Sequence, residues 1–381
     1  MLTRIGHAAF AADRRVLVTS DIHGHCDQLR QLLEKACYEP DNDALIIVGD
    51  MLEKGWQNLE TLRMVMRLSE NGEVYTLIGN ADLTLYNFLT VDDGEVRKKL
   101  IERINGGKRY WSWTVWDEVC QEIGMPYVPD MDFDEAVRRA RVHLKKEIEF
   151  LGNALTILET PEYIFVHAAL PHERLSELEG TDNWPLVKTD DFYGSAPAFS
   201  RWVVTGHWPV PLMRETLQSA NPVVDEVRKL ICLDGGCGVK RIGQLNMMIL
   251  QGGERSFLFC DSHRRFRALA DQAGSESEPV YIKWTTRFIE AAEPMGDVTR
   301  ILYHGKTLMV PSTFVSENPW DGMICDDVTD RRLPVRSGEI LYCIEPTSQG
   351  LFCKQDGVCG WYDGPYEWVD APVASRGGMI Q

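Results

Sequence analysis

Short polar motifs follow β-branched runs at five points along the chain, and each contains residue types that bind metal ions. The motifs are Asp21-Ile22-His23-Gly24, Gly49-Asp50, Gly79-Asn80-Ala81-Asp82, Val166-His167 and Thr205-Gly206-His207. Loops after successive parallel strands meet at the carboxyl edge of a sheet. We therefore expect six side chains to share one crevice: Asp21, His23, Asp50, Asn80, His167 and His207. Taken singly, each could instead be a polar strand end or a helix cap.

The mixture of carboxylate, amide and imidazole groups determines which ions would bind. It suits borderline-hard cations, with Mn²⁺ as our first choice and Fe²⁺ or Zn²⁺ as the alternatives. Six ligands are too many for one catalytic metal that keeps open positions, so we predict two divalent ions. Two such ions about 3.5–4 Å apart can hold a bridging hydroxide and neutralise the attacking and leaving oxygens of a phosphoryl displacement. The predicted reaction is hydrolysis of a phosphoester.

The elements that carry these motifs alternate between short apolar strands and longer helices. Strands are expected at 16–18, 44–48 and 74–78, with helices at 27–36 and 58–70 between them. Strand character returns at 163–166, 202–205, 230–233 and 244–250, whereas the charged segment 84–158 is expected to be a helical insertion. The fold class is therefore α/β.

The length of 381 residues favours two domains. Residues 1–260 are expected to form the first. The segment 261–279 is polar and rich in small residues, which is typical of a linker. Strands dominate from 280 to 381, where Asp356-Gly357 lies between two apolar runs and predicts a tight β-hairpin. This second domain should be small and all-β.

The charge balance excludes several kinds of partner. With 40 Lys and Arg against 57 Asp and Glu, the formal net charge is −17, which should repel duplex nucleic acid and anionic membranes. The 10 cysteines are scattered, without the density of a disulfide framework. Neither a targeting segment nor a long apolar span is visible. We expect a cytoplasmic protein with reduced thiols.

Five ordered motifs now carry a resemblance to a known family. DIHG at 21–24, GDMLEKG at 49–55, GNAD at 79–82, VHAAL at 166–170 and GHWPV at 206–210 resemble the motifs of calcineurin-like metallophosphoesterases. With LDGG at 233–236, they look most similar to the phosphoprotein phosphatase branch, which includes bacterial members and symmetrical diadenosine tetraphosphatases. The resemblance implies a β-sandwich flanked by helices. It also implies one metal on Asp21, His23 and Asp50, and a second on Asp50, Asn80, His167 and His207, with Asp50 bridging.

Two departures from the family pattern affect catalysis. The position after Asn80, where the family has a general-acid His, is Ala81. The phosphate-gripping Arg of the second motif is replaced by Lys54, which keeps the charge but loses the fork geometry. We therefore expect Asp50, Asn80 and Lys54 to act in catalysis, with His25 as a substitute acid and His172 as a weaker candidate. Asp82 is interpreted as a helix N-cap.

Three functional outcomes stay open from the sequence. The chain could act on a phosphoprotein or a nucleotide-like phosphate with an acidic leaving group, or recruit a substitute acid. Alternatively, it could be a catalytically impaired metal-containing binding protein. Tryptophans at 111, 113 and 116 are interpreted as core residues, with a base-stacking platform as the alternative. The basic run at 138–146 is either a solvated helix face or a set of anion contacts.

The C-terminal segment GEILYCIEPTSQGLFCKQDGVCGWY at 338–362 resembles a bacterial SH3-type barrel. That resemblance implies recognition of a peptide or wall-like ligand, or docking onto the catalytic domain. Trp361, Tyr362 and Tyr366 are the candidate contact residues, if they are exposed.

Overall fold

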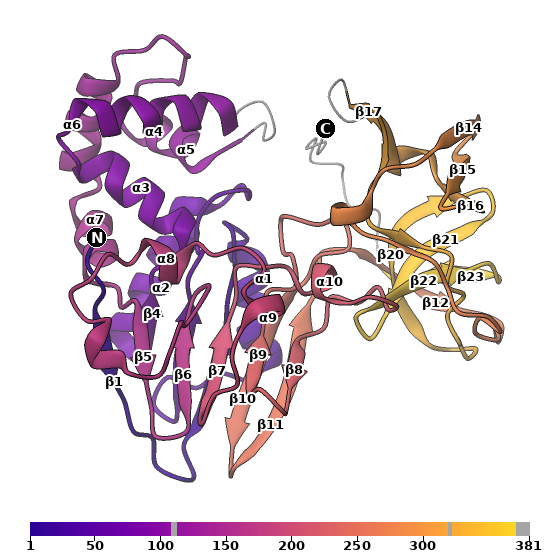
Figure 1. Ribbon diagram of the computed structural model, residues 1–381, viewed down its shortest axis with the longest axis horizontal. Helices are drawn as coiled ribbons and strands as arrows, with labels where there is room; N and C mark the ends of the chain where they lie inside the picture. Colours follow the sequence, from indigo (N-terminus) through magenta and orange to yellow (C-terminus); the bar gives the residue numbers. More distant parts are fainter. Residues whose placement is uncertain (108–112, 319–321, 371–381) are drawn as a thin grey trace.

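The computed structural model describes residues 1–107, 113–318 and 322–370 (Figure 1). A β-sandwich occupies the lower left of Figure 1, helices α3 to α6 lie above it, and the C-terminal strands lie to the right. Within the described ranges, no helix is long and apolar enough to cross a membrane. The prediction for Trp111 falls outside these ranges.

Two sheets form the sandwich, as the resemblance predicted. The first sheet has the order β1 (Ile5–His7), β5 (Ile157–Glu159), β6 (Tyr163–Val166), β7 (Trp202–Thr205), β9 (Leu230–Cys232) and β8 (Val223–Asp225). The second sheet has the order β11 (Glu254–Cys260), β10 (Leu245–Gln251), β2 (Arg15–Thr19), β3 (Asp43–Val48) and β4 (Glu73–Leu77). Val18 and Ile46 pack against Phe165 and Val204 between them. Alternate residues of each inner strand therefore form a buried layer.

Each sheet contains a run of three parallel strands. β2, β3 and β4 run parallel in the second sheet, and β6, β7 and β9 run parallel in the first. The loops that follow them are joined by backbone hydrogen bonds, in which the Asp21 N–H donates to the Gly49 carbonyl and the Gly206 N–H donates to the His167 carbonyl. The carboxyl ends of both sets of strands therefore meet at one edge of the sandwich.

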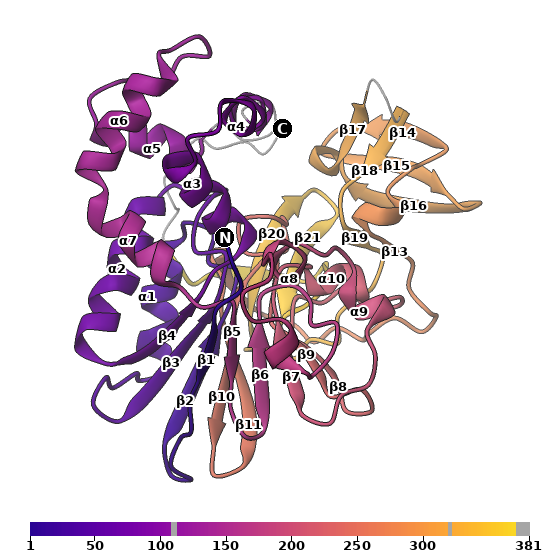
Figure 2. The ribbon, with the colours of Figure 1, turned by 60° about the vertical axis from the view of Figure 1, so that its left-hand side comes forward.

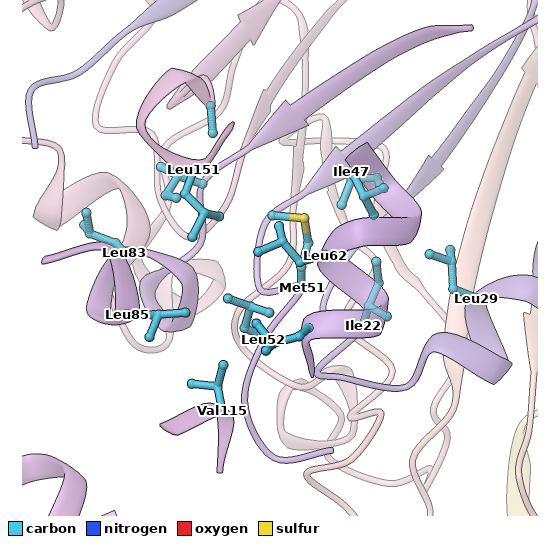
Figure 3. Close-up of a cluster of buried hydrophobic side chains, with 14 of the residues drawn as sticks. Ile22, Leu29, Ile47, Met51, Leu52, Leu62, Leu83, Leu85, Val115 and Leu151 are labelled. Atoms are coloured by element: carbon cyan, nitrogen blue, oxygen red, sulfur yellow. The ribbon is translucent and has the colours of Figure 1, made fainter. Parts of the chain in front are cut away.

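Two helices, α1 (Cys26–Lys35) and α2 (Asn58–Asn71), cover the outer face of the second sheet. The helices that follow pack on α2 and on one another: α3 (Asn80–Thr90), α4 (Gly94–Gly107), α5 (Val115–Glu122), α6 (Phe133–His143) and α7 (Lys145–Asn153). Figure 3 shows Ile22, Ile47, Met51, Leu62 and Leu83 among the apolar side chains that meet in this layer. The expected helical character of 84–158 agrees with the last five helices.

Short helices cover the outer face of the first sheet. They are η1 (Leu175–Glu177), α8 (Trp184–Val187), α9 (Phe192–Ser195) and α10 (Val210–Met213). Leu170, Leu186 and Phe199 fill the space beneath them. α8 is of functional interest because the residues that follow it approach the metal-ligand motifs.

The C-terminal region is all-β, as predicted. Its main sheet has the order β22 (Val358–Tyr362), β21 (Gly350–Gln355), β20 (Ile340–Thr347), β12 (Arg264–Ala268) and β23 (Tyr366–Trp368). Smaller sheets pair β13 (Tyr281–Ile282) with β19 (Val328–Thr329), β14 (Ala291–Met295) with β15 (Val298–Tyr303) and β16 (Lys306–Pro311), and β17 (Val315–Asn318) with β18 (Gly322–Cys325). Figure 2 shows these strands as a body beside the sandwich.

Asp356 and Gly357 connect β21 to β22 with φ of 48° and 76°. This left-handed pair is what a two-residue hairpin requires. Tyr362, expected as an exposed contact residue, is fully buried against Phe266, so that interpretation is wrong. The SH3-like label and a peptide ligand stay predictions.

The expected linker 261–279 needs a correction. Strand β12 lies inside it and pairs with both β20 and β23, so its first part belongs to the C-terminal sheet. Gln272 is also fixed, since it exchanges backbone hydrogen bonds with Val335. The segment was misread because most of its side chains are polar, although Phe266 and Ala268 point into the core. The division of the chain into domains at these boundaries stays a prediction.

Candidate metal centre

The six predicted ligand residues come together where the carboxyl ends of the two sheets meet. Asp21, His23 and Asp50 each offer a ligand atom within 4.8 Å of the other two, and so do Asp50, His167 and His207. Nε2 of His23 lies 3.7 Å from Oδ2 of Asp50, and Nε2 of His167 lies 3.4 Å from Oδ1 of Asp50. Asp50 therefore belongs to both groups, with one carboxylate oxygen toward each.

Asn80 completes the second group. One atom of its side-chain amide lies 3.4 Å from Nε2 of His167 and 2.7 Å from Nδ1 of His207. Which amide atom is oxygen is assigned from the surroundings. A nitrogen at that position would donate to His207, whereas an oxygen there would converge with both imidazoles on a cation. The same arrangement thus serves as a ligand set once an ion is bound.

Backbone strain is concentrated at these ligands. Four of the six have positive φ: Asp21 at 56°, His23 at 48°, Asp50 at 50° and His207 at 68°. L-residues rarely adopt this conformation, and its clustering is typical of functional sites. Gly79 is required next to the centre, because a Cβ there would lie 2.2 Å from the backbone nitrogen of Asp50. The sequence thus uses strained turns to point the side chains inward.

Hydrogen bonds behind the ligands fix the orientation of the imidazole rings. Nδ1 of His167 lies 2.8 Å from the Val48 carbonyl, and Nδ1 of His23 lies 3.0 Å from the Leu52 carbonyl. Both rings therefore donate through Nδ1 and turn the Nε2 lone pair toward the centre. This is the usual way in which proteins orient metal-binding histidines.

The electrostatics of the centre favour a bound cation. Burial raises the pKa of Asp21 well above its usual range, with Asp234 as the next cause, and raises that of Asp234 to about 6. Burial lowers the pKa of His23 to about 3 and that of His207 to about 4, which leaves their lone pairs free. Burial opposes the charge on His167, but the nearby carboxylate of Asp50 raises its pKa to about 10. A divalent ion would compensate the crowded carboxylates.

The donor set therefore fits divalent metal ions. Carboxylate and imidazole groups converge in two triads, and the ligand side chains of Asp21, His23, Asp50 and His167 are at most 2% exposed. Buried charges at such density persist when they are paired or coordinate metals.

Two lysines place ammonium groups beside the ligand cluster. Nζ of Lys54 lies 3.3 Å from Nε2 of His23, and Nζ of Lys188 lies 3.4 Å from Nε2 of His207. Nε2 of His207 also lies 3.0 Å from Oδ1 of Asp190, and this carboxylate pairs with Lys188. Lys54 was predicted from its motif. Lys188 and Asp190 were missed, because they follow a short helix rather than a strand.

Asp234 is a further buried carboxyl group that sequence reasoning did not select. It lies two residues after β9, and the Gly236 N–H donates to it at 2.8 Å. An acidic residue after a strand was the same signal that identified the other ligands.

Asp82 needs a correction in detail. The N-cap of α3 is Gly79, and Asp82 is the third residue of the helix. Its carboxylate accepts from the N–H groups of Gly79, Met51 and Leu52 at 3.0, 3.0 and 3.1 Å. Asp82 therefore holds the turn after Asp50 against the start of α3, instead of only capping its own helix.

Neither predicted substitute for the general acid, His25 or His172, makes contacts that suit this role. Ala81 is buried, and its N–H donates to Oδ1 of Asp50 at 2.8 Å. Nδ1 of His25 lies 2.6 Å from the His23 carbonyl, and burial lowers the pKa of His25. His172 faces Glu177 at 3.7 Å. A neutral His25 with Nδ1 tied to the backbone is poorly suited to donate a proton, so its catalytic role stays a prediction.

The structure also decides between the alternatives for Trp116 and for the basic run at 138–146. Trp116 is 1% exposed and packs on Phe88 and Phe133, so it is a core residue. The basic run lies on helix faces in ion pairs, with Arg138 and Arg139 on Glu135, and it gives no anion site at the centre.

Comparison with known proteins agrees with this geometry. The family model for calcineurin-like phosphoesterases matches residues 14–226. The chain belongs to the calcineurin-like phosphoesterase family. Metal-dependent hydrolysis of phosphoester bonds, the predicted reaction class, is the chemistry of this family, and divalent metal ions are its cofactors.

Curated relatives are symmetrical bis(5′-nucleosyl)-tetraphosphatases. One from Baumannia cicadellinicola is 40% identical over 80 residues, which is 21% of this chain and 26% of the relative. One from Shewanella loihica is 46% identical over 65 residues, 17% of this chain and 23% of the relative. The aligned part thus spans about a quarter of these relatives. They agree with the predicted branch.

The solved structures that match this chain have lower sequence identity. A putative diadenosine tetraphosphatase is 18% identical with a TM-score of 0.44, covering 68% of this chain and 99% of that one. A protein serine/threonine phosphatase from Saccharomyces cerevisiae is 13% identical with a TM-score of 0.41, covering 68% and 84%.

Proposed function

We propose that this chain hydrolyses a phosphomonoester or phosphoanhydride of a phosphoprotein or nucleotide-like substrate with two divalent cations. The observation that carries the proposal is the pair of buried ligand triads that share Asp50. Shared carboxylates of this kind are how proteins hold two metal ions close together. A cytoplasmic location remains part of the proposal.

Each ion has its own set of residues. Asp21, His23 and Asp50 would hold one cation, and Asp50, Asn80, His167 and His207 would hold the other. Mn²⁺ is the first choice for this donor set, with Fe²⁺ or Zn²⁺ as alternatives. When bound, such ions supply Lewis acidity toward the phosphoryl group and activate water.

The lysines orient the substrate. Lys54 beside His23 and Lys188 beside His207 place one positive charge next to each ligand triad. Phosphate oxygens held between them would be neutralised on both sides. Because an ammonium is a point charge without the fork of arginine, the two lysines fix the phosphate less rigidly than an arginine pair would.

The leaving group determines which substrates turn over fast. Ala81 provides no proton for a departing alkoxide, and one missing general acid typically costs about 10²–10⁴ in rate. The phosphate leaving group of a phosphoanhydride and the phenolate of an aryl ester can depart without that proton, because their conjugate acids are stronger than an alcohol. The names of the curated relatives, bis(5′-nucleosyl)-tetraphosphatases, also support a phosphoanhydride substrate.

A second candidate function is a metal-containing binding protein whose partners contact the C-terminal strands. The observation that favours it is the pair of substitutions at Ala81 and Lys54, which remove the acid and the fork while leaving the metal ligands intact. Its partner would be a phosphorylated ligand held without turnover, or a peptide bound by the C-terminal domain.

The test is a set of initial rates with the Mn²⁺-loaded chain. The substrates are an aryl phosphomonoester, a phosphoserine peptide and diadenosine tetraphosphate, and Asp50→Asn serves as the control that should abolish metal-dependent turnover. We expect hydrolysis of the aryl ester and the anhydride, and slow release from phosphoserine. Equal rates on phosphoserine would mean that another acid is present. No turnover above the control on any of the three would favour the binding protein.

A further inference from the structure

A pair of tryptophans lies in stacked contact beside the metal centre. The rings of Trp56 and Trp113 have centroids 5.9 Å apart and an angle of 23° between their planes. Trp56 comes from the loop after the second metal motif, and Trp113 lies two residues before α5. Trp56 is 50% exposed although Trp113 covers one of its faces. Half of the Trp56 surface is therefore open to solvent in spite of this contact.

The position of Trp56 is fixed relative to the ligands. A Cβ on Gly55 would lie 2.2 Å from the His23 carbonyl, and the Gln57 N–H donates to the Gly24 carbonyl at 3.0 Å. The segment 55–57 is thus pressed against the loop that holds His23. Lys54 points its ammonium at His23, and the Cα atoms of residues 54 and 56 can be at most about 7 Å apart. Trp56 is therefore two residues from the lysine that contacts His23, on the loop that packs against the His23 loop.

The second tryptophan is held in place by a carboxylate. Nε1 of Trp113 donates to Oε1 of Glu118 at 3.2 Å. The same carboxylate accepts from the N–H groups of Asn58 and Leu59, both at 2.8 Å, at the start of α2. Glu118 therefore connects Trp113 to the start of α2, the element that follows Trp56.

Trp56 differs from Trp284, another half-exposed tryptophan, in that its loop contacts the loop of a predicted metal ligand. Trp116, three residues after Trp113, is buried in the core, whereas Trp56 leaves apolar area in water. Large exposed aromatic groups beside a polar site are typical of ligand contacts. A flat aromatic group that stacks on Trp56 would remove this area from water.

We propose that Trp56, backed by Trp113, stacks on the nucleobase of a nucleotide phosphate whose phosphoryl group faces Lys54 and the metal ligands. This inference rests on the proposed function and narrows its substrate class. A nucleotide fits the spacing, because its ribose separates the base from the phosphate. In an aryl phosphate such as phosphotyrosine the ring is bonded directly to the phosphate oxygen, which would hold it inside the ligand cluster. Stacking of a base on an aromatic side chain changes affinity by about 5- to 150-fold.

The test is calorimetric binding to the Mn²⁺-loaded full chain with two probes that are not turned over. Adenosine 5′-(α,β-methylene)diphosphate carries a base, and methylenediphosphonate does not. Trp56→Ala should weaken the first about 5- to 150-fold and leave the second within about twofold. Trp56→Phe should retain most of the affinity. Trp284→Ala removes another exposed tryptophan, 48% exposed and in the C-terminal region, and should change neither probe.

The outcomes separate this inference from the proposed function. Equal weakening of both probes, or no effect of Trp56→Ala on the adenosine probe, would overturn the stacking inference even if the enzyme is active. A larger effect on a phosphotyrosine peptide than on the adenosine probe would overturn the choice of a nucleobase. If the wild-type chain hydrolyses nothing, the proposed function fails, but the binding comparison still decides the stacking because it needs no turnover.

Discussion

Replacing Lys354 with methionine should strongly destabilise the chain, because this lysine is a buried charge between the C-terminal strands and the sandwich. Its side chain is 0% exposed, and Nζ lies 2.5 Å from Oδ2 of Asp261, which is also 0% exposed. The ammonium also donates to the Ile242 carbonyl at 2.7 Å, the Gly243 carbonyl at 3.3 Å and Oε1 of Gln244 at 3.2 Å. Lys354 thus satisfies several acceptors of the chain that leads into β10.

The magnitude follows from what the substitution leaves behind. Burial raises the pKa of Asp261, and the charge of Lys354 is the main effect that lowers it below its usual value. Without the lysine, Asp261 would be an uncompensated buried carboxylate. Removing one partner of such a pair costs about 3–5 kcal/mol in free energy of unfolding. At about 2–4 °C per kcal/mol for domains of this size, Tm should fall by about 6–20 °C.

Thermal and urea unfolding of the full chain, followed by circular dichroism, measure this loss. The double variant Asp261→Asn with Lys354→Met removes both charges, and it should recover most of the lost stability. Lys145→Met is the matched control, since its side chain is 75% exposed, and it should stay within about 0.5 kcal/mol of the wild type. A loss below about 1 kcal/mol for Lys354→Met, or a double variant no more stable than the single one, would refute the reasoning.

Three further results are expected at the metal centre. In the metal-free chain, the free energy of unfolding should fall between pH 7 and 9 by at most about 1.4 kcal/mol per pH unit. The pKa of His167 is raised to about 10, so its stabilising contribution is complete below about pH 6.5 and is lost as the pH rises toward 10. Urea titrations should show a flatter pH profile for His167→Gln. Gly79→Ala should lower the affinity for Mn²⁺ about 10- to 100-fold, since the new Cβ would lie 2.2 Å from the Asp50 nitrogen. Gly94→Ala is the control, because its Cβ would have no atom within 4 Å, and it should leave Mn²⁺ binding measured by calorimetry unchanged. Lys188→Met should raise KM for an aryl phosphate about tenfold, because it removes one charged contact. A KM equal to that of the exposed-lysine control Lys145→Met would contradict the role of Lys188.

The convergence of the six candidate ligands was predictable because local sequence determines where they lie. Each follows a short apolar strand, and parallel strands bring their carboxyl ends together whatever else the chain does. Asp234 follows the same rule and could have been found by it. What local sequence does not show is the strain: the left-handed turns at Asp21, His23 and Asp50 are occupied by ligands, where glycine would be the usual residue.

Strand β12 was missed for the opposite reason. Its partners β20 and β23 come about 70 to 100 residues later in the chain, and the Arg-rich segment shows apolar residues only at Phe266 and Ala268. Propensity and alternation read along the chain do not reveal such pairings, because the energy of a strand comes from its neighbours in the sheet. A polar segment between two domains therefore resembles a linker until its partners are known.

The proposed substrate-facing residues, unlike the predicted metal ligands, depend on contacts between parts of the chain that are far apart in the sequence. Lys188 reaches His207 from the end of a short helix, and Trp113 reaches Trp56 across more than fifty residues of intervening chain. Neither contact follows from a strand end or a helical period. The predicted ligands of the ions thus lie on the sandwich, whereas the groups that we propose to select the substrate come from loops and inserted helices around it. We therefore expect motif order to identify the chemistry of the centre, and we expect the choice between a phosphoprotein and a nucleotide to depend on Trp56.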